Sequence, residues 1–329
     1  MEFYGGEDID ADADENDIFV YRGGQAPLHV THVRIDKSVD VIEDQAFLNC
    51  ENLVHVQTHN GIRKVGRRAF EHCNSLRWLN FKSAVEVGAF AFSCCSYLAS
   101  VEFGDNLETL ERYAFERCTS LKHIKLPSVF IIQEGTFCRC DNITNIEFSE
   151  RLKEIIGEYT FFQCAQLQRI AIPFKRGLFA YNYARMMYCQ FEYCEQLSTV
   201  ELVGGIHKTV ASLHMESWKT DMHEGIKCIN QVLPNIPADE KTDEISLWMA
   251  RLIHKFYRYK AEHCRYVNEA TALLELALWK AALGEKEDNC AEGKTKKIKV
   301  DAESARKGKR IKCGADTVIK YVLPFLKLE

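Results

Sequence analysis

Apolar positions recur along the chain with a period in the low twenties, between about residue 30 and residue 202. In each copy a phenylalanine is followed three residues later by a cysteine, then by an aliphatic residue, and then by two apolar residues that alternate with polar ones. Segment 114–126 is one such copy. Alternation over a short run predicts a strand with one side in the core. A fixed period of this length predicts a solenoid of stacked copies.

The two most regular positions predict two internal columns. No single copy can bury these side chains, but stacked copies bring equivalent residues together, about 4.8 Å apart along parallel strands. One predicted column consists of Phe47, Phe70, Phe92, Phe115, Phe137 and Phe161. The other consists of Cys50, Cys73, Cys95, Cys118, Cys140, Cys164 and Cys194, which follow one another at separations of 23, 22, 23, 22, 24 and 30 residues.

The repeated unit, Phe-x-x-Cys-x-x-Leu-x-x-Val/Ile-x-Phe/Leu with alanine before the phenylalanine, resembles the BspA-type leucine-rich repeat over roughly residues 28–203. The resemblance implies an α+β repeat solenoid, a parallel-strand stack that binds proteins or surfaces, and it implies no catalysis. Thr136 and Thr160 replace the alanine, and an insertion over residues 173–193 precedes Cys194. We expect these departures to disturb the last repeats without changing the fold.

The flanking segments predict caps, helices and a linker. Residues 1–27 form an acidic tail, in which Ile18–Tyr21 are expected to cover the apolar end of the first repeat. Apolar spacing becomes helical over residues 204–284, the expected C-terminal α-helical domain. We predict one helix from His207 that ends before Pro234, a second from Asp243, and a segment over 267–283 that stops at Gly284 and that could continue the second. A basic polar linker (285–312) and a C-terminal helix (313–329) follow.

The amino-acid composition limits the cellular compartments and the classes of partner that we expect for the chain. The formal net charge of −5 argues against a chain that generally binds nucleic acid. The sequence contains no signal peptide and no apolar run of about 18 residues, so we predict no membrane span. An intracellular, cytoplasmic location follows, in which the 14 cysteines are reduced, and the basic linker leaves a nuclear location open.

Outward strand positions supply the candidate site. Because strand residues alternate, polar side chains form two lines on one face, which we expect to be the concave face of the solenoid and to bind a protein partner. One line is His32, His55, Trp78, Ser100, His123, Asn145, Arg169 and Thr199, and the other is Arg34, Gln57, Asn80, Glu102, Lys125, Glu147, Ala171 and Glu201. An exposed Trp78 would be the main anchor. The alternative is a solubilising surface whose charges compensate each other across strands.

No catalytic or metal site stands out. Cys138-x-Cys140 and Cys94-Cys95 lack the second ligand pair that zinc requires, so we predict no metal and no cofactor. The prediction is therefore a non-catalytic interaction scaffold whose partner and oligomeric state the sequence does not indicate. The alternative is an enzyme or regulatory subunit with its activity in the helical region. It predicts a cleft lined by His214, Asp221, His223 or Glu224.

Overall fold

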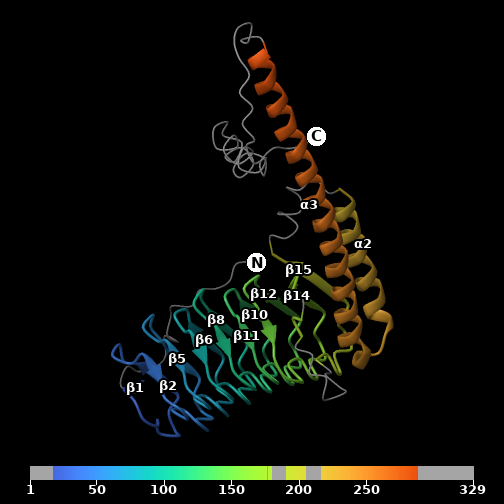
Figure 1. Cartoon of the computed structure of the whole chain (residues 1–329). Helices are drawn as coiled ribbons and strands as arrows, with labels where there is room; N and C mark the ends of the chain where they lie inside the picture. The colour runs from blue at the N-terminus through green and yellow to red at the C-terminus, as the bar shows by residue number, and fades with distance from the viewer. Residues whose placement is uncertain (1–17, 176, 180–189, 205–215, 288–329) are drawn as a thin grey trace, which may run out of the picture. The chain divides into compact units, whose positions relative to one another are not determined.

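A computed structural model describes residues 18–175, 177–179, 190–204 and 216–287 of the chain, with side chains up to residue 279 (Figure 1). The chain divides into two compact units, residues 1–206 with 221–253 and residues 207–220 with 254–329. The first unit contains the repeats. The predicted linker from residue 288 onward and the predicted C-terminal helix lie outside the part of the chain that the structure describes.

Two rows of parallel strands build the solenoid: the short strands form one six-stranded sheet, and the long strands form three sheets of three, two and four strands. The long strands follow one another along the length of the solenoid in Figure 1. The long strands are β1 (Ile18–Tyr21), β2 (His32–Ile35), β4 (His55–Gln57), β6 (Trp78–Phe81), β8 (Ser100–Phe103), β10 (His123–Leu126), β12 (Asn145–Phe148), β14 (Arg169–Pro173) and β15 (Thr199–Val203). The short strands are β3 (Val41–Ile42), β5 (Lys64–Val65), β7 (Glu86–Val87), β9 (Thr109–Leu110), β11 (Ile131–Ile132) and β13 (Glu154–Ile155). The repeats predicted from the period are confirmed, since paired strands are parallel and in register, as in His123↔Asn145↔Arg169.

The phenylalanine column is confirmed. All six predicted rings are fully buried, and neighbours stack, with ring centroids 5.1 Å apart for Phe92 and Phe115. Tyr21 on β1 extends the column at one end, 4.8 Å from Phe47, as the expected cap. Phe191 extends it at the other end, 5.2 Å from Phe161. The sequence analysis left Phe191 out of the column because the insertion separates it from Phe161 by 30 residues.

The cysteine column is buried as predicted, but its thiols are also hydrogen-bond donors. From Cys73 onward each thiol points to the carbonyl oxygen of the phenylalanine one turn earlier, as Cys118 Sγ does to Phe92 O at 3.1 Å. The same bond joins Cys73 to Phe47, Cys95 to Phe70, Cys140 to Phe115, Cys164 to Phe137 and Cys194 to Phe161, at distances between 3.0 and 3.2 Å. Burial raises the pKa of the Cys118 thiol well above its ordinary value. The column is therefore a line of neutral thiols that link successive turns.

Each turn passes through left-handed backbone on either side of the column phenylalanine. Around Phe115 these residues are Tyr113 and Arg117, with φ of 55° and 57°. Such φ values cost an L-residue about 1–2 kcal/mol. The N–H of Tyr113 donates to Glu134 O at 2.9 Å and that of Arg117 donates to Cys138 O at 2.8 Å, so bonds to the next turn offset the cost.

Three polar side chains stand in for the missing next turn after β15. They come from the end of α2 (Glu216–Val232) and the start of α3 (Lys241–Glu287). The Asn230 amide accepts from Val200 N at 2.8 Å and donates to Val200 O at 3.3 Å, as a neighbouring strand would. Thr242 Oγ1 accepts from Phe191 N at 3.2 Å. The buried Lys241 ammonium donates to the carbonyl oxygens of Cys194, Glu195 and Leu197.

The first predicted helix ends as expected, because α2 ends at Val232, before Pro234, but the second differs from the prediction at its C-terminal end. α3 is continuous from Lys241 to Glu287, so the expected stop at Gly284 is wrong. A glycine without left-handed backbone keeps its helical hydrogen bond and only lowers the propensity, by about 1 kcal/mol. Pro234 lies inside a short 3-10 helix, Leu233–Asn235, between α2 and a second one, Ala238–Glu240. The part of the first predicted helix before residue 216 lies outside the described residues.

The insertion begins as a continuation of the solenoid. Phe179 bridges in parallel to Ile155 at the end of the short-strand ladder, and its ring packs against Phe191 with centroids 5.8 Å apart. Lys175 Nζ donates to Glu150 O and Leu152 O. The aromatic ring of Phe179 is therefore used for packing against the solenoid. Tyr181 and Tyr183 fall outside the described residues.

Candidate binding face of the long strands

The polar strand residues form two lines of neighbours on one face. Register pairs include His32↔His55 and Trp78↔Ser100 in one line, and Arg34↔Gln57 and Lys125↔Glu147 in the other. The residues of the two predicted lines up to Arg169 are all half-buried or exposed. The short alternation of the strands, apolar inward and polar outward, is what places them there.

Ala171 is an exception to the predicted lines, because it is fully buried. Its register neighbours are Glu147 and Glu201. A single methyl group between two longer side chains offers no surface of its own. The expectation that Ala171 contributes to an outward polar line is therefore wrong, and the line is interrupted at β14.

Three rings form a ladder across β2, β4 and β6. The centroids of His32 and His55 are 6.2 Å apart, and those of His55 and Trp78 are 5.6 Å apart in an edge-on arrangement. Trp78 is half-buried by this contact and not fully exposed as the sequence analysis expected. His32 Nδ1 lies 3.1 Å from Thr31 Oγ1, whereas its buried Nε2 has no hydrogen-bond partner among the described residues. Buried polar atoms are rarely left unpaired in native structures.

Charges, and not rings, occupy the other end of the face. The Arg169 guanidinium bonds to the Glu201 carboxylate and lies 3.7 Å from that of Glu147. The bond to Glu201 raises the pKa of Arg169, and the same bond lowers the pKa of Glu201. Lys82 and Glu102 form a further pair at 3.6 Å. Here the predicted alternative, charges that compensate each other across strands, describes the surface well.

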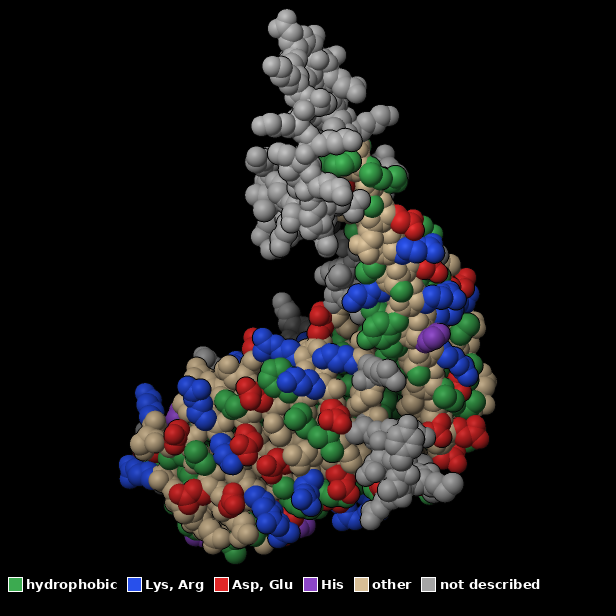
Figure 2. All heavy atoms as spheres, viewed as in Figure 1, with side chains coloured by type: hydrophobic (Ala, Val, Ile, Leu, Met, Phe, Trp, Pro, Cys, Tyr) green, Lys and Arg blue, Asp and Glu red, His purple; other side chains and the backbone are tan. Residues whose placement is uncertain are grey.

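The space-filling view agrees with a mixed surface. Figure 2 shows one side of the molecule, on which basic and acidic side chains alternate over the solenoid and hydrophobic side chains are scattered among them. Exposed charge pairs of this kind contribute about 0–1 kcal/mol each and serve mainly solubility. The ring ladder is therefore the part of the long-strand face that differs from this mixed charged surface.

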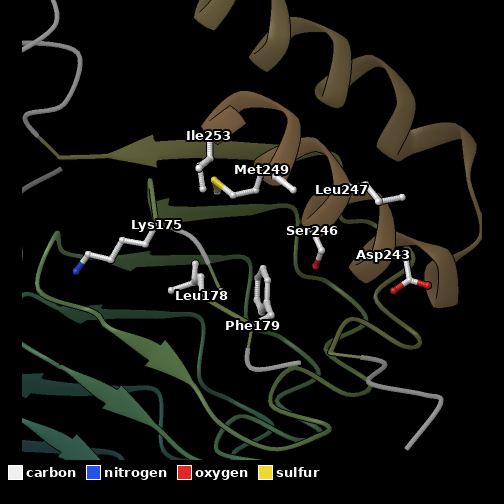
Figure 3. Close-up of a pocket in the computed structure, with 10 residues that line it drawn as sticks. Lys175, Leu178, Phe179, Asp243, Ser246, Leu247, Met249 and Ile253 are labelled. Carbon is white, nitrogen blue, oxygen red and sulfur yellow. The ribbon is translucent and has the colours of Figure 1, made fainter. Parts of the chain in front are cut away.

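An apolar hollow of about 410 Å³ lies between the start of the insertion and the first turns of α3 (Figure 3). Leu178, Phe179, Met249 and Ile253 line it. A catalytic pocket needs convergent polar groups. The Lys175 ammonium is directed away from the hollow in Figure 3, and it donates to the backbone oxygens of Glu150 and Leu152. The other charged and hydroxyl side chains of its lining are Asp243 and Ser246, at the start of α3.

The residues named for an activity in the helical region do not line this hollow. His223 and Glu224 are exposed on α2, Asp221 is half-buried, and His214 lies outside the described residues. Within the described ranges, no group of three or more His, Cys, Asp or Glu side chains is placed to hold a metal ion. Among the described helices, none combines the length and the apolar character needed to cross a bilayer.

Comparison with known proteins shows which repeat family the chain resembles. The sequence model of the BspA type leucine rich repeat region matches the chain in six copies, over residues 26–130, 81–194 and 113–217. A leucine rich repeat protein from T. pallidum is 21% identical over 60% of this chain and 88% of its own, with a TM-score of 0.38. A leucine-rich repeat protein from Bacteroides ovatus is 24% identical over 53% of this chain and 56% of its own, with a TM-score of 0.37.

A leucine rich cell surface protein from Faecalibacterium prausnitzii is 21% identical over 53% of this chain and 60% of its own, with a TM-score of 0.27. A comparison with curated proteins gave no match. The family match from residue 26 to residue 217 spans more than half of the 329 residues. It also coincides with the stacked phenylalanine and cysteine columns. The chain belongs to the BspA-type leucine-rich repeat family.

Proposed function

We propose that the chain is a non-catalytic scaffold that binds a partner protein on the long-strand face, which we take to be the concave face of the solenoid. The ring ladder of His32, His55 and Trp78 is the anchor of this site. The single observation that carries the proposal is the half-buried Trp78, held edge-on by His55 with ring centroids 5.6 Å apart. Leucine-rich repeat proteins of this family are in general interaction or surface-adhesion scaffolds.

The ladder has the properties of an interface hot spot. Tryptophan side chains dominate binding energy where a partner can desolvate them. Trp78 is already fixed by His55, so binding would cost little side-chain entropy there. The polar residues Arg34 and Gln57, joined by a hydrogen bond of 2.9 Å, would form part of the surrounding rim.

The experiment compares the proteins captured by the full-length chain and by two variants, using quantitative mass spectrometry. Trp78→Ala should lose a defined set of proteins that wild type captures. Tyr97→Ala is the matched control, because Tyr97 is 66% exposed on the solenoid but lies outside the long strands. Melting temperatures establish that both variants are folded.

A protein from that set is then purified and its affinity measured directly. We expect Trp78→Ala to weaken binding at least tenfold, which corresponds to about 1.4 kcal/mol. The proposal fails if the captured set and the affinity are the same for wild type and Trp78→Ala. It also fails if Tyr97→Ala and Trp78→Ala lose the same proteins.

We also propose that the scaffold works inside the cell, in the cytoplasm or, through the basic segment 285–312, in the nucleus. The support is chemical: the column thiols from Cys73 to Cys194 each donate to a backbone carbonyl, a role that requires them to stay reduced. Fractionation combined with thiol alkylation in intact cells tests this. Oxidised column cysteines or a surface-exposed chain would refute it.

A further inference from the structure

A second groove runs along the turns that precede the long strands. It is lined by the residues two positions after the column phenylalanines, including His72, Cys94, Arg117 and Arg139, and it encloses about 560 Å³. Their backbone N–H groups are bound by the next turn, as for His72 N to Ser93 O at 2.9 Å and Arg139 N to Phe162 O at 2.7 Å. The groove is therefore built on a rigid backbone that repeats from turn to turn.

Two like charges are neighbours in this groove. Arg117 and Arg139 occupy equivalent positions in adjacent turns, which places their backbones about 4.8 Å apart. Arg117 is exposed and Arg139 is half-buried, and neither forms an ion pair or a side-chain hydrogen bond with any residue in the described part of the chain. Elsewhere on the solenoid, neighbouring turns pair opposite charges, as Lys64 does with Glu86 at 2.7 Å.

Neither of the nearest acidic groups forms an ion pair with the two arginines in the described part of the chain. Glu116 accepts a hydrogen bond from Ser93 Oγ at 3.3 Å. Asp141 lies at the rim of the groove and is exposed. Burial raises the pKa of its carboxyl, and Arg139 opposes that shift. Two guanidinium groups without carboxylate partners attract an anion that can bridge them.

The length and polarity of the groove indicate an extended peptide. Its wall runs from the turn of His72 to the turn of Gln163, four spacings or about 19 Å, which matches about six extended residues. The side-chain amides of Asn74 and Gln163 stand near its two ends and have no hydrogen-bond partner in the described ranges. Free amides of this kind can bond to the backbone of an extended chain.

We propose that this groove binds a phosphorylated peptide segment of a partner protein, with the phosphate monoester bridging Arg117 and Arg139. A phosphate monoester carries close to two negative charges at neutral pH and three acceptor oxygens, which suits two guanidinium groups on adjacent turns. The site is separate from the ring ladder on the strands. The solenoid thus has two separate binding surfaces: the aromatic ring ladder and the phosphate-binding groove.

The test is fluorescence anisotropy with the full-length chain and two degenerate seven-residue peptide libraries. One has phosphoserine fixed at the centre and the other has serine. We expect the phosphoserine library to bind at least tenfold more tightly. Arg117→Gln and Arg139→Gln should each weaken its binding at least tenfold. Arg112→Gln removes the same charge from an exposed position of the same solenoid and should leave the affinity unchanged.

A second readout follows Cys94, which lines the groove. Bound phosphopeptide should slow the alkylation of Cys94 severalfold, and should leave the alkylation of exposed Cys228 unaffected. Binding of inorganic phosphate and of vesicles with phosphatidylinositol phosphate is measured in addition. Equal binding of both libraries overturns the proposal. So does an equal loss of binding in Arg112→Gln, or binding to the vesicles without binding to the phosphopeptides.

Discussion

The Cys118 thiol donates a hydrogen bond to the carbonyl oxygen of Phe92, one turn earlier and 3.1 Å away. The same oxygen also accepts from Cys95 N at 3.2 Å, so one carbonyl joins two successive turns. A free cysteine is usually treated as a small hydrophobe. In this solenoid the repeated thiol is in addition a donor, which explains why a sulfur-bearing residue suits a position where alanine would also fit.

Cys118→Ser and Cys118→Ala distinguish these two roles. Both variants remove the sulfur, but only serine keeps a donor for Phe92 O. We expect Cys118→Ser to be more stable than Cys118→Ala by about 1 kcal/mol in urea unfolding, the usual value of one net hydrogen bond. If the thiol only filled space, the buried hydroxyl would make the serine variant the less stable of the two.

Phe115→Ala should lower the free energy of unfolding by about 3–5 kcal/mol, because it empties a slot in a closely packed column. Phe115 is fully buried between Phe92 and Phe137, at centroid distances of 5.1 and 5.7 Å. Phe90→Ala is the control, since Phe90 stacks on Tyr113 in the half-buried outer layer. Its cost should be clearly smaller. The free energies of unfolding are measured with urea. Equal losses for the two variants would contradict a special contribution of the central column to stability.

Lys241→Met tests how the solenoid ends. It leaves the carbonyl oxygens of Cys194, Glu195 and Leu197 without the ammonium that now satisfies them. We expect a loss of about 3 kcal/mol, since each buried unpaired group costs about 1–3 kcal/mol and methionine recovers part of the burial. Lys227→Met, at an exposed position of α2, should change the stability by less than about 0.5 kcal/mol. The midpoints of thermal unfolding are compared for the two variants. Equal midpoints would show that Lys241 does not stabilise the end of the solenoid.

Stability should fall as the pH rises from 9 towards 11. Burial raises the pKa of the Cys50 and Cys138 thiols to about 11. The folded chain therefore retains protons that the unfolded chain releases above its ordinary thiol pKa, and each release favours unfolding. Urea midpoints at pH 8, 9 and 10.5 measure the slope. Cys138→Ala should make the decrease of stability with pH shallower. An unchanged decrease in that variant would show that other groups cause it.

The sequence alone determined the repeat, because the regular period shows that equivalent apolar residues must be buried against neighbouring copies. Side chains such as Phe70 and Phe92 cannot be buried within one copy, so a regular spacing of 22 or 23 residues already requires stacked turns. The same alternation determined which strand residues face outward, from His32 to Arg169. It also indicated that Tyr21 and its neighbours would cover the first turn.

Only the tertiary structure decided how groups without a periodic signal are satisfied. Asn230, Lys241 and Thr242 replace the backbone of an absent turn, and nothing in their local sequence marks them, because their partners lie 30 to 51 residues away. Phe191 joins the column across the insertion, and Ala171 is buried between longer neighbours. These outcomes depend on which atoms meet across turns, whereas a linear pattern specifies only which residues share a position.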